Sequence, residues 1–412
     1  MTVELEGSAY SLRGLRRFLF VLGPAWIVMI ADVDAPSIIT AGESGAKFGY
    51  QMIFVLLVLI IPLFFIQEAS GRVGLATGKG LAAVIRDNYS KDLAVLAALP
   101  MFLTDFLGYV GEYTGIAVGL GVFGISPLLS LPIAFVLHAT LVFTGSYRKT
   151  ERILLAISGI LLFSYVLDVF LVKTNLTYLI HTSVPFQSYT QASFAFLVAA
   201  NVGAVIMPWM LFYQTGAVVE KGLNQSHVRW ERLETLVGAV VSELLMVAIV
   251  VVAAPLDGVD FLSPSSLGEA LAPLAGKYAA VLFGIGLASA GFLALVAISL
   301  ASTWGIAEAF GWRAKIGERF SMARNFYFLY LVETLPAALI PLFFKDLVKL
   351  MLDLMVIFVF VLVAPAVLQG LIGSNQRLMG PNVLGRCWKV VYWIMLALVV
   401  CAGLLAVPTL LS

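Results

Sequence analysis

Long hydrophobic runs follow one another along most of the chain and are separated by short polar stretches. A helix needs about 20 apolar residues to cross the hydrocarbon core of a bilayer. Runs of that length predict eleven membrane-spanning helices in an all-α protein, with no soluble domain. The predicted spans are residues 18–40, 50–70, 93–121, 127–146, 150–172, 193–219, 234–255, 279–304, 326–344, 347–372 and 388–411.

Basic residues in the loops indicate how these helices are oriented. If the N-terminus lies in the cytoplasm, only five of the 25 Lys and Arg residues fall outside, namely Lys47, Lys173, Lys277, Lys345 and Lys349. Because cytoplasmic loops carry an excess of Lys and Arg, this pattern predicts a cytoplasmic N-terminus. With eleven spans the C-terminus is then external. The short loops are typical of a bacterial inner-membrane protein.

The composition narrows the class of protein further. Hydrophobic residues make up 61% of the chain and charged residues 12%, and the mean hydropathy is +1.00. These values are typical of a polytopic membrane protein, and the net charge of +1 gives no attraction to nucleic acid. The sequence shows no Walker-type phosphate loop, Ser/His/Asp arrangement or His/Cys metal spacing, so we do not expect an enzyme. The expected partners are a substrate and the lipid bilayer, without a cofactor or an obligatory protein partner.

Polar residues interrupt the first predicted span. Asp32, Asp34, Pro36 and Ser37 lie close together inside residues 18–40. A proline removes a backbone donor and clashes with the preceding turn, so the helix should break near Asp34. Such a break is tolerated where the freed carbonyl groups line a cavity, and these carbonyls can then bind a cation. The first span therefore predicts half of a cation site.

A second break is predicted in the sixth span, at the segment from Asn201 to Met210 that contains Pro208. Two interrupted helices in corresponding positions of two halves are typical of transporters built from inverted repeats. The repeats would cover about residues 18–172 and 193–372, followed by an extra helix at 388–411. An odd number of spans per repeat gives the opposite topology that the loop charges require.

At these two breaks the chain resembles the natural resistance-associated macrophage protein (NRAMP) family of divalent metal transporters. The family's first-helix motif Asp-Pro-Gly-Asn falls on Asp34-Ala35-Pro36-Ser37, and its sixth-helix motif Met-Pro-His-Asn falls on Met207-Pro208-Trp209-Met210. The resemblance covers nearly the whole chain. It implies a leucine-transporter-like fold of 5+5 inverted repeats, with helices one and six broken, that works by alternating access. Further segments that match the family are Gly23 to Trp26, Gly45 to Tyr50, Thr77 to Lys79 and Arg377 to Gly380.

The resemblance also implies a set of metal ligands. Asp34 matches the family's metal-binding aspartate, Met207 its methionine, and Ser37 stands where the family has an asparagine. Backbone carbonyls near Ala31 and Ala204 would complete the shell. A thioether is a soft ligand, so Met207 favours Mn²⁺ or Fe²⁺ over Mg²⁺.

Three groups associated with the family's proton route are absent. Trp209 and Gln214 replace two histidines of the sixth helix, and Tyr109 replaces an aspartate of the third, whereas Glu112 is retained. Asp105 lies one helical turn before Tyr109 and could substitute. Proton coupling is therefore left open. The candidates for a proton or gating role are Glu112, Asp105 and Asp32.

Other polar or large residues of the predicted spans extend the candidate site. Trp209, Met210, Gln214 and Asp353 are expected to line the pocket. Asp353 is singled out because the family often has an extra polar ligand in the tenth helix. The sequence assigns no role to the remaining intramembrane acids, which are Asp168, Glu243 and Glu333.

The sequence thus predicts a secondary transporter of divalent metal cations, with Mn²⁺ or Fe²⁺ favoured and a proton as a second transported ion if transport is coupled. One alternative is a Mg²⁺-permeable uniporter related to this family, because an altered site could accept a hydrated Mg²⁺. Another is a carrier of a small organic solute on the same fold, with Trp209 and Tyr213 lining its pocket.

Overall fold

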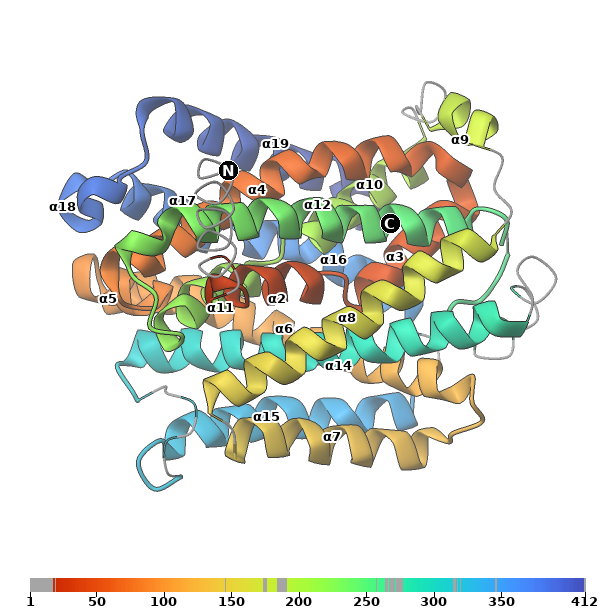
Figure 1. Ribbon diagram of the computed structural model, residues 1–412, viewed down its shortest axis with the longest axis horizontal. Helices are drawn as coiled ribbons and strands as arrows, with labels where there is room; N and C mark the ends of the chain where they lie inside the picture. The colour runs from red at the N-terminus through yellow and green to blue at the C-terminus, as the bar shows by residue number, and fades with distance from the viewer. Residues whose placement is uncertain are drawn as a thin grey trace, which may run out of the picture.

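The computed structural model describes residues 18, 20–144, 146–172, 176–183, 191–256, 258–263, 266, 271, 277–313, 316, 318, 320–344 and 347–410. These residues form helices joined by short loops, and most of the long helices run roughly along the longest axis of the molecule (Figure 1). The helices of the first half are α2 (Pro24–Ala31), α3 (Ala35–Phe48), α4 (Met52–Thr77), α5 (Leu81–Asn88), α6 (Lys91–Gly121), α7 (Pro127–Thr144), α8 (Tyr147–Leu171) and α9 (Leu176–Thr182).

The second half continues in the same manner. Its helices are α10 (Ala192–Val205), α11 (Pro208–Glu220), α12 (Val228–Ala253), α14 (Lys277–Phe310), α15 (Arg324–Leu339), α16 (Val348–Val361), α17 (Val363–Gly373), α18 (Gln376–Met379) and α19 (Arg386–Leu410). Four 3₁₀ segments join them: η1 (Gly49–Gln51), η2 (Gln225–His227), η3 (Ile340–Leu342) and η4 (Gly380–Asn382).

Each of the eleven predicted spans contains one or two of these helices. By length and composition, nine helical stretches of the described residues could cross a membrane, and Pro127–Phe143 is a shorter apolar helix. One of the nine, Ala35–Thr77, extends over two predicted spans because η1 connects α3 directly to α4. The number of crossings and the division into two repeats remain predictions.

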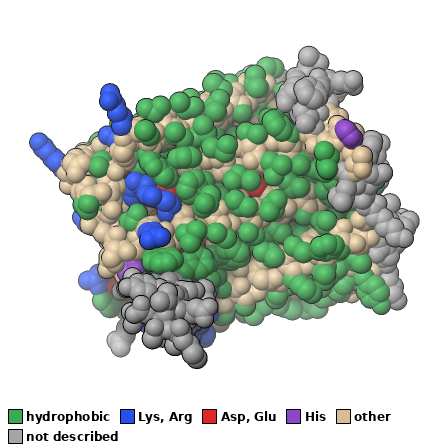
Figure 2. Space-filling model, turned by 45° about the horizontal axis from the view of Figure 1, so that its top comes forward, with side chains coloured by type: hydrophobic (Ala, Val, Ile, Leu, Met, Phe, Trp, Pro, Cys, Tyr) green, Lys and Arg blue, Asp and Glu red, His purple; other side chains and the backbone are tan. Residues whose placement is uncertain are grey.

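The surface fits an integral membrane protein. Large apolar side chains face outward along the sides of the bundle, and Figure 2 shows apolar side chains over much of one face, with Lys and Arg side chains gathered at one end. Exposed apolar surface of this extent is typical of contact with lipid. Examples are Leu103, Phe163, Phe170, Phe328 and Leu398, all more than half exposed.

Two helices differ from the prediction in length or continuity. The second span was expected to end at residue 70, but α4 continues to Thr77, and Arg72 in this added part forms a buried ion pair with Glu68 one turn before it. The tenth span, expected to be one helix over 347–372, divides at Leu362 into α16 and α17. Pro365 follows this point and cannot donate to the carbonyl four residues earlier.

Close packing holds the first break against α6. A Cβ atom added to Gly111 would lie 2.5 Å from Pro36 Cγ, and one added to Gly115 would lie 2.2 Å from the Cβ of Ala35. Only glycine therefore allows α6 to approach the start of α3 this closely. This approach brings the side chain of Glu112, on the same helix, to the break.

Candidate metal site

The first break lies between α2 and α3, as predicted. Asp34 precedes α3 with an extended backbone, and its carboxylate accepts a hydrogen bond from the Ser37 N–H at 2.8 Å. The N–H of Ala35 would donate to the Ala31 carbonyl in a continuous helix, but it donates instead to the Glu112 carboxylate at 3.1 Å. The break thus leaves the Ala31 carbonyl without its helical donor, beside a buried carboxylate.

The second break lies between α10 and α11, also as predicted. Because Pro208 has no N–H, the carbonyl of Ala204 lacks the donor that a continuous helix would supply. The hydroxyl of Ser37 donates to this carbonyl at a distance of 3.2 Å. Since Ser37 belongs to α3 and Ala204 to α10, this hydrogen bond joins the two breaks directly.

Two thioethers lie at the second break. The Met207 sulfur accepts a hydrogen bond from Trp209 Nε1 at 3.3 Å, and the Met210 sulfur accepts one from the Met207 N–H at 3.4 Å. All three side chains are fully buried. Trp209 and Met210 each contact Met207, and their role in lining a pocket remains a prediction. The thioether of Met207 keeps further lone-pair density for a metal ion, because the indole N–H uses only part of it.

Carboxyl groups concentrate at the first break. Glu112 accepts the N–H of Ala35, the residue after Asp34, and Asp32 is buried beside Asp34 and Glu243 of α12. None of these four acids belongs to an ion pair within the described part of the chain. Uncompensated negative charge is costly in a buried membrane site, so protons or a bound cation must neutralise these groups.

Three predicted residues lie away from this cluster. The side-chain amide of Gln214 donates to Glu231 and to Thr235, both on α12. Asp353 forms an ion pair with Lys349 at 2.9 Å on the exposed side of α16. Asp105 lies two turns from Glu112 along α6. The structure therefore joins Gln214 and Asp353 to other partners and places neither in the buried cluster.

The start of α2 is held in place by residues that the sequence did not single out. The carboxylate of Glu234, on α12, accepts hydrogen bonds from the N–H groups of Gly23 at 2.6 Å and Trp26 at 2.8 Å. It thereby caps α2, whose own preceding residue is a glycine without a capping side chain. Lys221 donates to the Leu22 carbonyl at 2.6 Å and pairs with Glu151 at 2.8 Å. These contacts hold the end of α2 against its neighbours.

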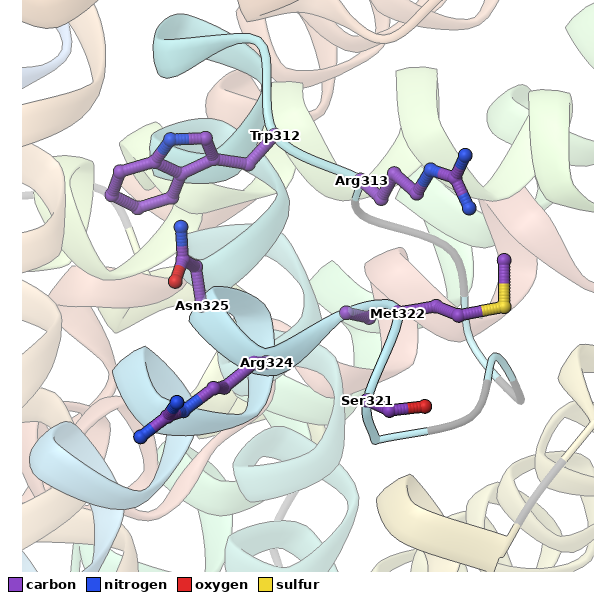
Figure 3. Close-up of a pocket in the computed structure, with 7 residues that line it drawn as sticks. Trp312, Arg313, Ser321, Met322, Arg324 and Asn325 are labelled. Carbon is purple, nitrogen blue, oxygen red and sulfur yellow. The ribbon is translucent and has the colours of Figure 1, made fainter.

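A separate cavity lies between the end of α14 and the start of α15 (Figure 3). It measures about 270 Å³, and its lining includes Trp312, Arg313, Arg324 and Asn325. In Figure 3 the guanidinium groups of Arg313 and Arg324 point in different directions. They therefore do not form a common anion site, and no residue of either helix break lines this cavity.

Comparison with known proteins identifies the family. The model of the natural resistance-associated macrophage protein-like family matches residues 25–409. The chain belongs to the NRAMP family. The match includes both helix breaks and every buried acid of the cluster, so the resemblance read from the two motifs is confirmed.

The NRAMP relatives include curated bacterial proteins. The divalent metal cation transporter MntH of Klebsiella pneumoniae is 28% identical over 399 residues, which covers 93% of this chain and 92% of that protein. MntH of Acidiphilium cryptum is 28% identical over 313 residues, covering 70% and 69%. These relatives place the chain in a family of membrane transporters.

Solved structures support the fold. A manganese transporter from Eremococcus coleocola superposes with a TM-score of 0.76 at 16% identity, covering 96% of this chain and 87% of that one. MhsT, solved in complex with L-phenylalanine, superposes with a TM-score of 0.65 at 13% identity, covering 93% and 98%. The predicted all-α, leucine-transporter-like NRAMP fold is therefore confirmed.

Proposed function

We propose that this NRAMP protein is a secondary transporter that carries divalent metal cations by alternating access, with Mn²⁺ or Fe²⁺ as preferred cargo. The observation that carries the proposal is the hydrogen bond from Ser37 to the Ala204 carbonyl, because it joins the two breaks. A carboxylate, freed carbonyls and a thioether then lie in one enclosed region. The names of the relatives, which are divalent metal and manganese transporters, support the same cargo.

Each ligand has a distinct task in this proposal. Asp34 supplies the negative charge that offsets the loss of the ion's hydration shell, and the Ala31 and Ala204 carbonyls with the Ser37 hydroxyl supply neutral oxygens. Met207 adds a soft donor that favours a transition metal. The metal ion is cargo, so we propose no resident cofactor.

Access from one side would depend on the end of α2. Release of the Glu234 and Lys221 contacts would free α2 from α12 and α11, while α3 stays packed on α6. We place this end of the molecule in the cytoplasm, together with the N-terminus, from the distribution of basic residues. Such a movement of half a helix is how a broken helix can open a central site.

A second cargo, Mg²⁺, has a specific observation in its favour. The hydrogen bond from Trp209 to the Met207 sulfur withdraws electron density from the soft ligand, while the oxygen donors of the first break remain. Mg²⁺ prefers oxygen ligands and keeps part of its hydration shell. The organic-solute alternative lacks such support, because Trp209 and Tyr213 pack against each other and are fully buried.

Metal binding by the purified protein tests this proposal. We expect Mn²⁺ to raise the melting temperature of the wild type in detergent, with a smaller rise for Mg²⁺ and none for either ion in Asp34→Ala. Asp168→Ala is the matched control, because it removes an equally buried aspartate from α8, which contributes to neither break. Equal metal stabilisation of the wild type and Asp34→Ala would contradict the proposed site.

A further inference from the structure

A second pair of buried acids lies between α6 and α15, apart from the helix breaks. Asp105 is fully buried and Glu333 is 2% exposed, and the two carboxyl groups lie close enough to repel each other. Glu333 accepts hydrogen bonds from Ser302 at 2.7 Å and from the Tyr109 hydroxyl at 3.4 Å. The α6, α14 and α15 helices that carry these residues contact one another (Figure 1).

No positively charged side chain of the described residues pairs with either acid. Neither acid forms an ion pair with a Lys, Arg or His of the described ranges. The titratable groups nearby are Tyr109 on α6, whose hydroxyl donates to Glu333, and Tyr330 on α15, which lies next to Tyr109. His138 on α7 stacks edge-on against Tyr330 and is hydrogen-bonded to Ser299, and α14 contributes the Ser302 hydroxyl. Two neighbouring carboxyl groups in a membrane interior cannot both stay charged, so protons or another cation must neutralise them.

Buried oxygen atoms near Asp105 and Glu333 that make no hydrogen bond with the described residues indicate a bound ligand. Both carboxylate oxygens of Asp105 are buried and have no hydrogen-bond partner among the described residues, since the single proton of the nearby Ser302 hydroxyl is donated to Glu333. The hydroxyl of Tyr330, next to Tyr109, is also buried and has no partner in the part of the chain that the structure describes. Buried polar groups normally find partners, and these atoms are all oxygens. Oxygen donors without sulfur or nitrogen suit a hard cation rather than a soft transition metal.

The pair is connected to the metal site through one helix. Tyr109 and Glu112 are one turn apart on α6, and Glu112 accepts the N–H of Ala35, the first residue of α3. A change of charge at Glu333 and Asp105 thus acts on the segment of α6 that holds the first break. The pair itself contains none of the proposed metal ligands.

We propose that Asp105 and Glu333, with Ser302 and Tyr109, form a second cation site that binds the monovalent ion driving metal transport, a proton or Na⁺. The inference rests on the proposed metal transport, and it assigns the coupling ion to a carboxyl pair between α6 and α15. This chain would thus couple transport without the histidines that Trp209 and Gln214 replace.

Flux measurements with the full chain in proteoliposomes test the coupling. Mn²⁺ uptake would be measured with no gradient, with an inward proton gradient, and with an inward Na⁺ gradient. We expect one gradient to stimulate wild-type uptake several-fold, and this stimulation to be lost in Asp105→Asn and Glu333→Gln. If only the proton gradient stimulates uptake, the coupling ion is a proton. If only the Na⁺ gradient does so, the coupling ion is Na⁺.

Two controls separate this inference from the proposed function. Asp168→Asn alters another buried acid and should retain the stimulation, and Mn²⁺ binding without a gradient should stay within about twofold in all three variants. Stimulation that persists in Asp105→Asn and Glu333→Gln, or wild-type uptake that neither gradient alters, would overturn the second site. Absence of wild-type Mn²⁺ binding and uptake would instead overturn the proposed metal transport.

A measurement without Mn²⁺ tests the site directly. The melting temperature of the detergent-solubilised wild type should fall with rising pH as both acids become charged, or rise with added Na⁺ as the pair is filled. Asp105→Asn should lose that dependence because one negative charge has been removed. If the wild type and Asp105→Asn respond identically to pH and Na⁺, the pair binds neither ion, whatever the metal assays show.

Discussion

The two helix breaks share the same backbone feature, an interruption near a proline, but they carry different side-chain ligands. Both remove the helical donor of a carbonyl group near a proline, and each has a proposed metal ligand at the position before its second half-helix. At the first break this residue is Asp34, a charged oxygen donor that accepts the Ser37 N–H. At the second it is Met207, a neutral sulfur donor hydrogen-bonded to Trp209. The charged ligand and the soft sulfur ligand thus come from separate helices. Mutations at the two breaks should therefore affect metal affinity and metal selectivity separately.

The largest expected effect is at the first break. Asp34→Asn keeps the shape of the side chain but removes the charge, so we expect binding of Mn²⁺ and Mg²⁺ to fall together by at least about 100-fold. Isothermal titration calorimetry with each ion measures this loss, with Asp168→Asn as the buried control. Retention of either ion by Asp34→Asn would show that the charge of the site comes from another acid.

The next largest effect is expected from a mutation at the second break, where the loss of metal binding should depend on the ion. Met207→Ala removes the soft ligand, so Mn²⁺ and Cd²⁺ binding should weaken about tenfold or more, and Mg²⁺ binding should change by less than about twofold. A competition assay between the ions measures the ratio of their affinities in each variant. Met246→Ala, a buried methionine of α12, controls for the loss of packing. An equal loss for Mg²⁺ and Cd²⁺ would rule out coordination by the sulfur.

A smaller effect should follow from freeing the Met207 sulfur. Trp209→Phe keeps an aromatic ring but removes the N–H donor, so Cd²⁺ and Mn²⁺ should bind about two- to fivefold more tightly, as expected for one neutral hydrogen bond. Trp304→Phe is the matched control, because the indole N–H of Trp304 is buried and has no partner within the described ranges. No gain in Trp209→Phe, measured by the same competition assay, would mean that the hydrogen bond does not weaken the ligand.

The smallest effect concerns the contact between the breaks. Ser37→Ala removes the hydrogen bond to Ala204, so the free energy of unfolding should fall by about 1 kcal/mol and metal affinity by about twofold for every ion. Thermal melting and calorimetry check the two values. Thr40→Ala, which removes a hydroxyl bonded only within α3, should lower stability but leave affinity unchanged. Identical metal affinities in Ser37→Ala and wild type would show that Ser37 does not contribute to the metal site.

Local sequence patterns were sufficient to predict the breaks and their polar residues. Pro36 and Pro208 dictate where the helices stop, and a buried aspartate beside a proline indicates a cation site. These features depend on residues a few positions apart, so the first and sixth spans could be interpreted before their packing was known.

Long-range contacts could not be predicted in this way. Glu234 caps α2 from more than 200 positions away, and Gln214 turns toward α12. Asp353 was expected near the metal but forms an i, i+4 ion pair with Lys349, a pairing that the local sequence does allow. The partner of a long polar side chain depends on which helices meet, and hydrophobic periodicity does not specify that.

Uptake of Mn²⁺ into proteoliposomes that contain the purified protein, with Mg²⁺ as competitor, tests the central claim most directly. The account predicts saturable Mn²⁺ uptake that is abolished in Asp34→Asn and inhibited only weakly by Mg²⁺. Liposomes that take up no Mn²⁺, or that take up equal amounts with wild type and Asp34→Asn, would contradict it.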